Sequence, residues 1–418
     1  MYKTSKKSTY VIIAIVTMIT TLFTSFSTFY VKADVNDSIE LINKYVDSIA
    51  KKDWGTFTSL MPNDEQADYQ NYFADNSITN GVKQIEEVTC KSITKVDNNN
   101  VKDDLLSNEF TILQHSNNIE SYIVGLDCKV STENEFFYNG LNYFLIVIAE
   151  ENGEMKIAQF NRPSYDLLKT VIDPSANQKD KEYSEEKAAL NVVENASNGL
   201  LVNANNEPIL DDKFEKIQIQ NSDFSNEDDK CSENKISNTL SSGFPILNYY
   251  TFYSYPSSIV VKMDLTGSGA IKTVNFNTYI KNVLPNEWFP SWNSEALKAG
   301  AYCVKMVGWY RTINPVSPSM GVNVYQTTQK YVPSTELTST NNAFNSISGL
   351  GMSNSEYKLF FPEYAAGTSG SAGSRAGGQL KQWGSQYLAS MGYGHNYILN
   401  YYYSGSEYSS GDLTYFSY

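Results

Sequence analysis

Histidine is scarce in this sequence, which has only His115 and His395 among its 418 residues. A Ser-His-Asp triad requires a histidine between the nucleophile and a carboxylate. A multi-histidine metal site requires several imidazoles. Two histidines far apart in the chain provide almost no material for either site. Any catalysis by this chain is therefore expected to use carboxylates.

Cysteine is also rare. The four cysteines, at positions 90, 128, 231 and 303, are too few and too scattered for a disulfide scaffold. No C-x-x-C motif or Cys/His cluster indicates a metal site. Cys90 and Cys128 could form a disulfide if their strands are neighbours. The alternative is a pair of small buried thiols, which is a common environment for free cysteine.

Basic residues are outnumbered, since 32 Lys and Arg against 46 Asp and Glu give a net charge of -14. Contact with nucleic-acid phosphates needs a basic face, so nucleic-acid binding is not expected. Aromatic residues, in contrast, are abundant, with 31 Tyr, 20 Phe and 5 Trp. Aromatic faces and directional hydrogen bonds are what hold sugars, so a neutral glycan is a compatible ligand.

The first 33 residues have the pattern of a signal peptide. Lys3, Lys6 and Lys7 form a basic start, residues 10–29 are apolar and threonine-rich, and Val31-Lys32-Ala33 ends in small residues suited to cleavage. The alternative is an uncleaved anchor, because about 20 apolar residues can also cross a bilayer. Either outcome predicts a protein outside the cytoplasm, extracellular or wall-associated if cleaved and membrane-anchored if not.

Residues 34–172 are predicted to form a first domain. Apolar residues recur at helical spacing over 37–51, and a less regular helical stretch covers 65–76. Four stretches rich in β-branched and aromatic residues follow, with a hairpin turn at Glu151-Asn152-Gly153. They cover residues 84–96, 119–131, 141–149 and 155–160. Helices followed by an antiparallel meander resemble the cone-shaped fold of nuclear transport factor 2, and we expect an accessory or partner-binding domain here.

The rest of the chain divides into a polar connector and a second domain. Residues 173–245 are rich in Asn, Asp, Glu, Lys and Ser, with one helix expected near 184–194. Residues 246–418 begin with a β-hairpin, then a short helical pattern over 277–283 and a helix over 293–311. The predicted class is α+β throughout. Glu287 is expected between the two helices, with Trp288, Phe289 and Trp292 around it.

Three ordered blocks of this second domain resemble one known family. The first is V-N-F-N-T-Y-I-K-N-V-L-P-N-E-W-F-P-S-W-N-S-E-A-L-K-A-G-A over residues 274–301, the second is T-S-G over 368–370, and the third runs from Q-W-G-S at 382–385 to I-L-N-Y-Y-Y at 398–403. Together they resemble the SpoIID/LytB family, which comprises sporulation stage II protein D and amidase enhancers. The resemblance covers about residues 250–410 and implies a peptidoglycan-directed domain.

The resemblance implies lytic transglycosylase activity, with Glu287 as the catalytic acid. Such an acid must stay protonated near neutrality, and apolar neighbours raise the pKa of a carboxyl group by desolvation. The C6 hydroxyl of the sugar attacks C1, so one carboxylate can act first as acid and then as base. The alternative for Glu287 is a solvated loop carboxylate, and Glu295 is interpreted as a helix-start carboxylate.

Six further residues are predicted to bind the glycan. An amide can hydrogen-bond sugar hydroxyls, an aromatic face can stack on a pyranose, and a Gly/Ser loop lets backbone amides approach closely. For Trp383 a place in the core is the alternative. The predicted substrate-binding residues are Tyr279, Trp288, Ser369, Gly370, Gln382 and Trp383.

The sequence also departs from the family pattern. Some members carry a metal-binding C-D-T-T-H-C stretch, where this chain reads Y-Q-T-T-Q-K over 325–330 and lacks the ligands. We therefore predict no zinc and no other cofactor. Two functions stay open: a transglycosylase acting on peptidoglycan glycan strands, or a non-catalytic wall-binding protein that enhances an N-acetylmuramoyl-L-alanine amidase. A deep groove ending at Glu287 would favour the first, and a fully solvated Glu287 the second.

Overall fold

The computed structural model describes residues 35–106, 109–172, 180–197, 201–203, 205, 207, 214–216, 254–265 and 269–418. The predicted signal segment and most of the predicted connector lie outside these residues. Helices and mainly antiparallel strands alternate, which confirms the α+β class. In the part of the chain described, no helix combines the length and apolarity needed to cross a membrane.

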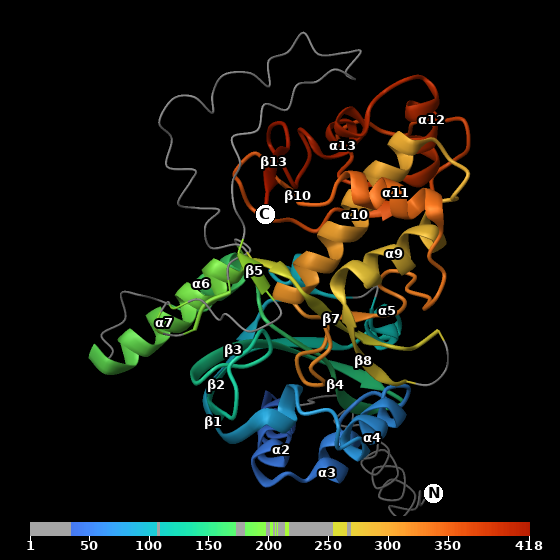
Figure 1. Ribbon diagram of the computed structural model, residues 1–418. Coiled ribbons are helices and arrows are strands. Elements are labelled where there is room, and N and C mark those ends of the chain that lie inside the picture. Colours follow the sequence, from blue (N-terminus) through green and yellow to red (C-terminus); the bar gives the residue numbers. More distant parts are fainter. Residues whose placement is uncertain are drawn as a thin grey trace, which may run out of the picture.

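The N-terminal part consists of helices packed on a four-stranded antiparallel sheet in the order β1-β2-β3-β4 (Figure 1). The strands are β1 (Ile85–Val96), β2 (Ile119–Val130), β3 (Gly140–Glu151) and β4 (Glu154–Asn161). Nearly every residue of β3 is buried, so both faces of that strand are covered. The helices and 3₁₀ turns are α2 (Val35–Lys51), α3 (Trp54–Ser59), α4 (Gln66–Ala74), η1 (Gly81–Gln84), η2 (Lys102–Asp104), α5 (Thr111–His115) and α6 (Tyr165–Val171).

The predicted strands and hairpin are confirmed in this part. Asn152 and Gly153 both have positive φ, 53° and 86°, as the tight two-residue turn between β3 and β4 requires. The order of helices followed by a meander is therefore present. The finer likeness to the cone of nuclear transport factor 2, and the domain boundaries, stay predictions.

The register of the sheet shows whether Cys90 and Cys128 can form a disulfide. β1 and β2 are neighbours, but Cys90 lies opposite Leu126 and Cys128 lies opposite Val88. Both thiols are free. The possible disulfide was therefore wrong and the alternative holds, with Cys128 buried and Cys90 half-buried.

The predicted helix near 184–194 is present as α7 (Asp180–Ser197). It packs against the β-sheet rather than standing in a loosely packed connector, because Ala189 and Val193 belong to the same buried cluster as β3. Leu201 and Val202 are buried beside Tyr138 and Val192. The interpretation of 173–245 as poorly packed was therefore wrong for these residues.

The C-terminal part is built around α10 (Ser294–Ile313), a helix that is buried along almost its whole length. Asn293 caps it by accepting a hydrogen bond from the Glu295 amide. Around it pack α9 (Phe276–Glu287), α11 (Thr338–Ser346), α12 (Gln382–Ser390) and α13 (His395–Tyr403) (Figure 1). A Cβ on Gly300 would lie 2.5 Å from the ring of Trp288, so glycine is required for this close approach.

Short strand pairs complete this part. β7 (Ser258–Lys262) lies between β8 (Ile271–Asn275) and β9 (Val324–Tyr325), and this hairpin of β7 and β8 was predicted. The other pairs are β5 (Phe214–Lys216) with β6 (Ser254–Pro256), β10 (Leu350–Ser353) with β13 (Thr414–Ser417), and β11 (Tyr364–Ala365) with β12 (Leu380–Lys381).

The two parts share one hydrophobic core. Val260, Val316, Met320, Val322 and Tyr325 of the C-terminal part are buried in the cluster that also holds the residues of the N-terminal sheet. In Figure 1 the β7 and β8 hairpin lies directly above that sheet. The accessory domain expected from the sequence is thus packed tightly against the segment that carries the site.

Candidate active site

Glu287 is the last residue of α9 and lies where three segments of the chain meet. Its Oε1 accepts a hydrogen bond of 2.9 Å from the backbone N–H of Lys330, which belongs to the loop after β9. Its Oε2 accepts a hydrogen bond of 3.1 Å from the Nε2 of Gln382, the first residue of α12. The structure therefore brings together Glu287 and Gln382, which are far apart in the sequence.

The carboxyl group of Glu287 is half-buried. Burial raises its pKa, and the two hydrogen bonds together with the charge of Lys330 lower it by less. Its two hydrogen bonds come from a backbone amide and a neutral side-chain amide, so neither donor carries a charge. Glu287 therefore holds a proton at higher pH than a solvated glutamate does, as a general acid requires.

Lys330 is held in place by a hydrogen-bonded network that sequence reasoning missed. The Tyr279 hydroxyl donates to Gln329 Oε1 at 2.9 Å, and Gln329 Nε2 donates to the Tyr364 hydroxyl at 3.1 Å. All three groups are largely or fully buried, so the segment before Lys330 is fixed. The available signal was the polar run at 325–330, whose side chains position backbone groups here.

Two predicted substrate-binding residues do not reach the surface. Tyr279 is fully buried, and Trp288 is 1% exposed, with its Nε1 donating to Ser385 Oγ at 3.1 Å. In this structure neither side chain is exposed to a glycan: Tyr279 lies in the core, and Trp288 turns inward after the end of α9. Trp288 instead packs in the core, where its ring centroid lies 5.0 Å from that of Tyr364.

An aromatic platform, defined as Phe289, Trp292 and Trp383, lies beside Glu287. The ring centroids of Trp292 and Trp383 are 4.8 Å apart, and those of Phe289 and Trp383 are 5.7 Å apart. Phe289 is 56% exposed, and both tryptophans are half-buried. Trp383 thus lies at the surface, next in sequence to the Gln382 that binds Glu287.

Ser369 and Gly370 lie in an exposed loop between β11 and β12. The loop begins at the aromatic platform, because Trp383 N donates to Ala366 O at 3.0 Å. Gly370 has a φ of 77°, which favours glycine. Among the described residues, no hydrogen bond joins Ser369 or Gly370 to Glu287, so their predicted contact with a glycan stays a prediction.

Glu295 has a different environment from Glu287. It accepts hydrogen bonds from the Lys298 ammonium at 2.7 Å, the His395 backbone N–H at 2.9 Å and the His395 Nδ1 at 2.6 Å. These donors lower the pKa of Glu295 to about 2 although burial opposes them. Glu295 is therefore ionised at neutral pH and fixes the start of α13 to the start of α10.

Within residues 35–418, as far as they are described, no group of three or more His, Cys, Asp and Glu side chains could hold a metal ion. In the run at 325–330, the side chains of Gln326, Thr328 and Gln329 make hydrogen bonds to other parts of the protein. This segment positions Glu287 through its backbone.

Comparison with known families agrees with the sequence blocks. The family model for the stage II sporulation protein SpoIID matches residues 265–350. The matched segment contains α9, α10 and α11, and with them Glu287, Glu295 and Lys330. The block at 382–403 lies outside the match, and no curated protein matches the chain. Residues 265–350 therefore match a SpoIID domain, which suggests a function related to sporulation or the cell wall.

Proposed function

We propose that this protein is an exported lytic transglycosylase that cleaves the MurNAc-GlcNAc bond of peptidoglycan glycan strands, in sporulation or cell-wall remodelling. The observation that carries the proposal is the position of Glu287. It combines a raised pKa, two neutral hydrogen-bond donors and an adjacent aromatic surface, all at or beside the SpoIID match.

In this mechanism Glu287 acts first as general acid. Its carboxyl proton moves to the departing glycosidic oxygen of GlcNAc as the bond from that oxygen to MurNAc C1 breaks. The MurNAc C6 hydroxyl then attacks C1 and gives its proton to the Glu287 carboxylate. The product is a 1,6-anhydro sugar, and the carboxyl group ends the cycle protonated. The reaction needs no second carboxylate and consumes no water, in contrast to hydrolysis by a glycosidase that uses two carboxylates.

The neighbours of Glu287 have separate roles in this proposal. The aromatic platform would stack on a pyranose ring and place the scissile bond at the end of α9. Gln382 would hold the carboxylate orientation and offer its second amide hydrogen to the sugar. Trp288, which is buried, and Tyr364, which is half-buried, would keep water away from the carboxyl group, and burial is the main cause of its raised pKa.

Export is part of the proposal, because peptidoglycan lies outside the cytoplasm. The basic and apolar residues of the first 33 positions support it, with either cleavage after Ala33 or retention as an anchor. The proposed partners are the glycan strands, with or without a wall amidase or another wall-remodelling protein.

The test is mass spectrometry of purified glycan strands, with and without stem peptides, after incubation with the protein. We expect 1,6-anhydro products from the parent protein and about 10²- to 10⁴-fold slower formation by the Glu287→Gln variant. Glu356→Gln is the matched control, since Glu356 is an exposed surface carboxylate that pairs with Lys358. If neither substrate gives a product while wall binding is retained, the transglycosylase activity is ruled out and the amidase-enhancing function is supported instead.

A further inference from the structure

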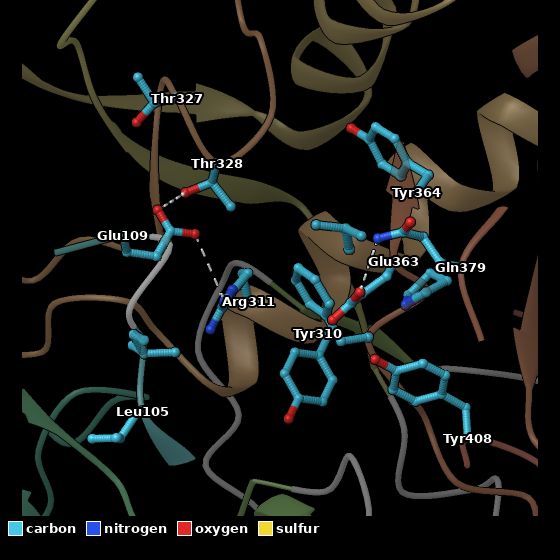
Figure 2. A pocket seen from close by; sticks show the side chains of 14 residues that line it. Leu105, Glu109, Tyr310, Arg311, Thr327, Thr328, Glu363, Tyr364, Gln379 and Tyr408 are labelled. Atoms are coloured by element: carbon cyan, nitrogen blue, oxygen red, sulfur yellow. Dashed lines mark hydrogen bonds and ion pairs between the residues drawn. The ribbon is translucent and has the colours of Figure 1, made fainter. Parts of the chain in front are cut away.

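A cavity of about 460 Å³ lies between the N-terminal and C-terminal parts, apart from the groups that hydrogen-bond Glu287. One wall is formed by Leu105 and Glu109 of the N-terminal part and by Arg311 of α10 (Figure 2). The opposite wall carries Glu363, Gln379 and Tyr408. The volume is within the range of about 300–1,000 Å³ that is typical of small-molecule sites.

The charges in this cavity oppose an anionic ligand. Arg311 lies 3.9 Å from Glu109 Oε1 and stacks over the ring of Phe361 at 4.7 Å, so its charge is already matched. Glu109 Oε2 also accepts a hydrogen bond of 3.0 Å from Thr328 Oγ1. On the other wall Glu363 accepts a hydrogen bond of 3.3 Å from the neutral amide of Gln379. With both carboxylates ionised, the two carboxylates and one guanidinium leave one negative charge, which opposes an anion. Burial raises the pKa of Glu109 and so brings the cavity towards neutrality, which is compatible with a neutral polar ligand.

The cavity nevertheless offers many hydrogen bonds and aromatic faces. Arg311 is only 8% exposed, and its Nε has no hydrogen-bond partner in the described part of the protein. A buried donor of this kind costs free energy unless a ligand or water satisfies it. Tyr310, Phe361, Tyr364 and Tyr408 supply rings among these polar groups. Rings combined with carboxylates, an amide and a guanidinium suit a polyhydroxylated ring.

We infer that this cavity binds a neutral saccharide of one or two N-acetylhexosamine units, as a second sugar site. The site needs both parts of the protein, because Glu109 and Leu105 come from one and Arg311, Glu363 and Tyr408 from the other. It goes beyond the proposed function, since binding here does not require Glu287 to be catalytic.

The cavity is connected to Glu287 through two short segments. Thr328 lines the cavity, and Lys330, two residues later, donates its amide to Glu287. Gln379 lines the cavity, and Gln382, three residues later, donates its side-chain amide to the same carboxylate. A sugar in the cavity would therefore stabilise both segments that hold Glu287.

The test is calorimetric titration of the full chain with N,N′-diacetylchitobiose. The measurement is made in a Trp383→Ala background, which removes the main ring of the aromatic platform as a competing site. Thr327→Trp is the blocking variant, because Thr327 is an exposed residue on the cavity lining. Thr94→Trp is the matched control, an exposed threonine of β1 that does not line the cavity. Gln379→Ala is a second cavity variant.

We expect the disaccharide to bind in the Trp383→Ala background. Affinity should fall about tenfold or more with Thr327→Trp and with Gln379→Ala, and should not change with Thr94→Trp. Unchanged affinity in both cavity variants, or no binding at all in this background, would overturn the inference. The Glu287→Gln variant separates the two proposals: it should bind the disaccharide normally even if it forms no anhydro product.

Discussion

Glu287 and Glu295 flank the same short turn between α9 and α10, yet their carboxyl groups have opposite properties. Burial opposes ionisation at both. At Glu295 an ammonium, an imidazole and a backbone amide overcome it and hold the pKa at about 2. At Glu287 the donors are a backbone amide and a neutral side-chain amide, so the effect of burial prevails and the pKa is raised.

The difference indicates that the charge of the donors, together with the degree of burial, decides which carboxyl group keeps its proton. The positions on either side of the turn are close in sequence, but their partners lie in segments far along the chain. One carboxylate is suited to proton transfer, and the other holds two helices together. Substitutions that change burial or donors should move each group toward the behaviour of the other.

The largest stability effect is expected from Trp288→Ala, which removes the buried ring of the residue that follows Glu287. The variant should lose about 3–5 kcal/mol of unfolding free energy, as is typical for a tryptophan removed from a core. Water that enters the space left by the indole should also lower the pKa of Glu287 toward its ordinary value. Urea unfolding measures the first effect, and the pH dependence of product formation measures the second. Trp383→Ala is the control, and an equal loss of stability there would contradict the distinction between core and platform.

A smaller and pH-dependent loss is expected from Glu295→Gln. At pH 7 the variant should lose about 1–2 kcal/mol, because the charged group accepts three hydrogen bonds and is partly screened by solvent. The pKa of Glu295 is lowered, so its stabilisation is present above the ordinary pKa of 4.5 and disappears as pH falls toward about 2. Unfolding curves at pH 7 and near pH 2 test this. A loss that is independent of pH would show that the ionised carboxylate is not the cause.

Substrate affinity should respond to the aromatic platform. Trp383→Ala is expected to raise the KM for glycan strands about tenfold with little change in kcat, because stacking binds the sugar before and during the reaction alike. Leu337→Ala is the matched control, since Leu337 is an exposed apolar residue outside the platform. If kcat falls and KM does not, Trp383 orients Glu287 rather than the sugar.

The smallest effect is expected on the pH dependence of stability in Glu287→Gln. The pKa of Glu287 is raised, so its favourable contribution is complete below the ordinary pKa of 4.5 and is lost as pH rises through the pKa of the folded state. Glutamine does not titrate, so the variant should gain stability relative to the parent as the pH rises from 4 to 8. Melting temperatures across this range test the sign. A relative gain at low pH would mean that the pKa is lowered.

Local patterns allowed much of the fold to be predicted. The strands of the meander, its hairpin turn and the helix from Ser294 follow periodicity, turn residues and capping, all of which act over a few positions. The exact end of the preceding helix did not follow in this way. Pro285 lies inside α9, which continues to Glu287, whereas a helical pattern was expected only to residue 283.

The candidate site could be predicted only in part. The family resemblance indicated Glu287 and Gln382, which the structure joins by a hydrogen bond. The inward turn of Trp288, the amide of Lys330 and the pairing of Glu295 with His395 were not predicted, because each depends on which segment packs on which. A backbone N–H is present in almost every residue type, so a sequence pattern cannot reveal which one will donate to Glu287.

The core that joins the two parts has a consequence for how the protein melts. Val316, Met320, Val322 and Tyr325 bury their side chains among residues of the N-terminal sheet. Removing that sheet would leave them exposed as an apolar surface beside the loop that supplies the Lys330 amide. Both parts should therefore unfold in a single cooperative transition. The C-terminal part alone should be prone to aggregate, so the N-terminal part is expected to act as its folding partner.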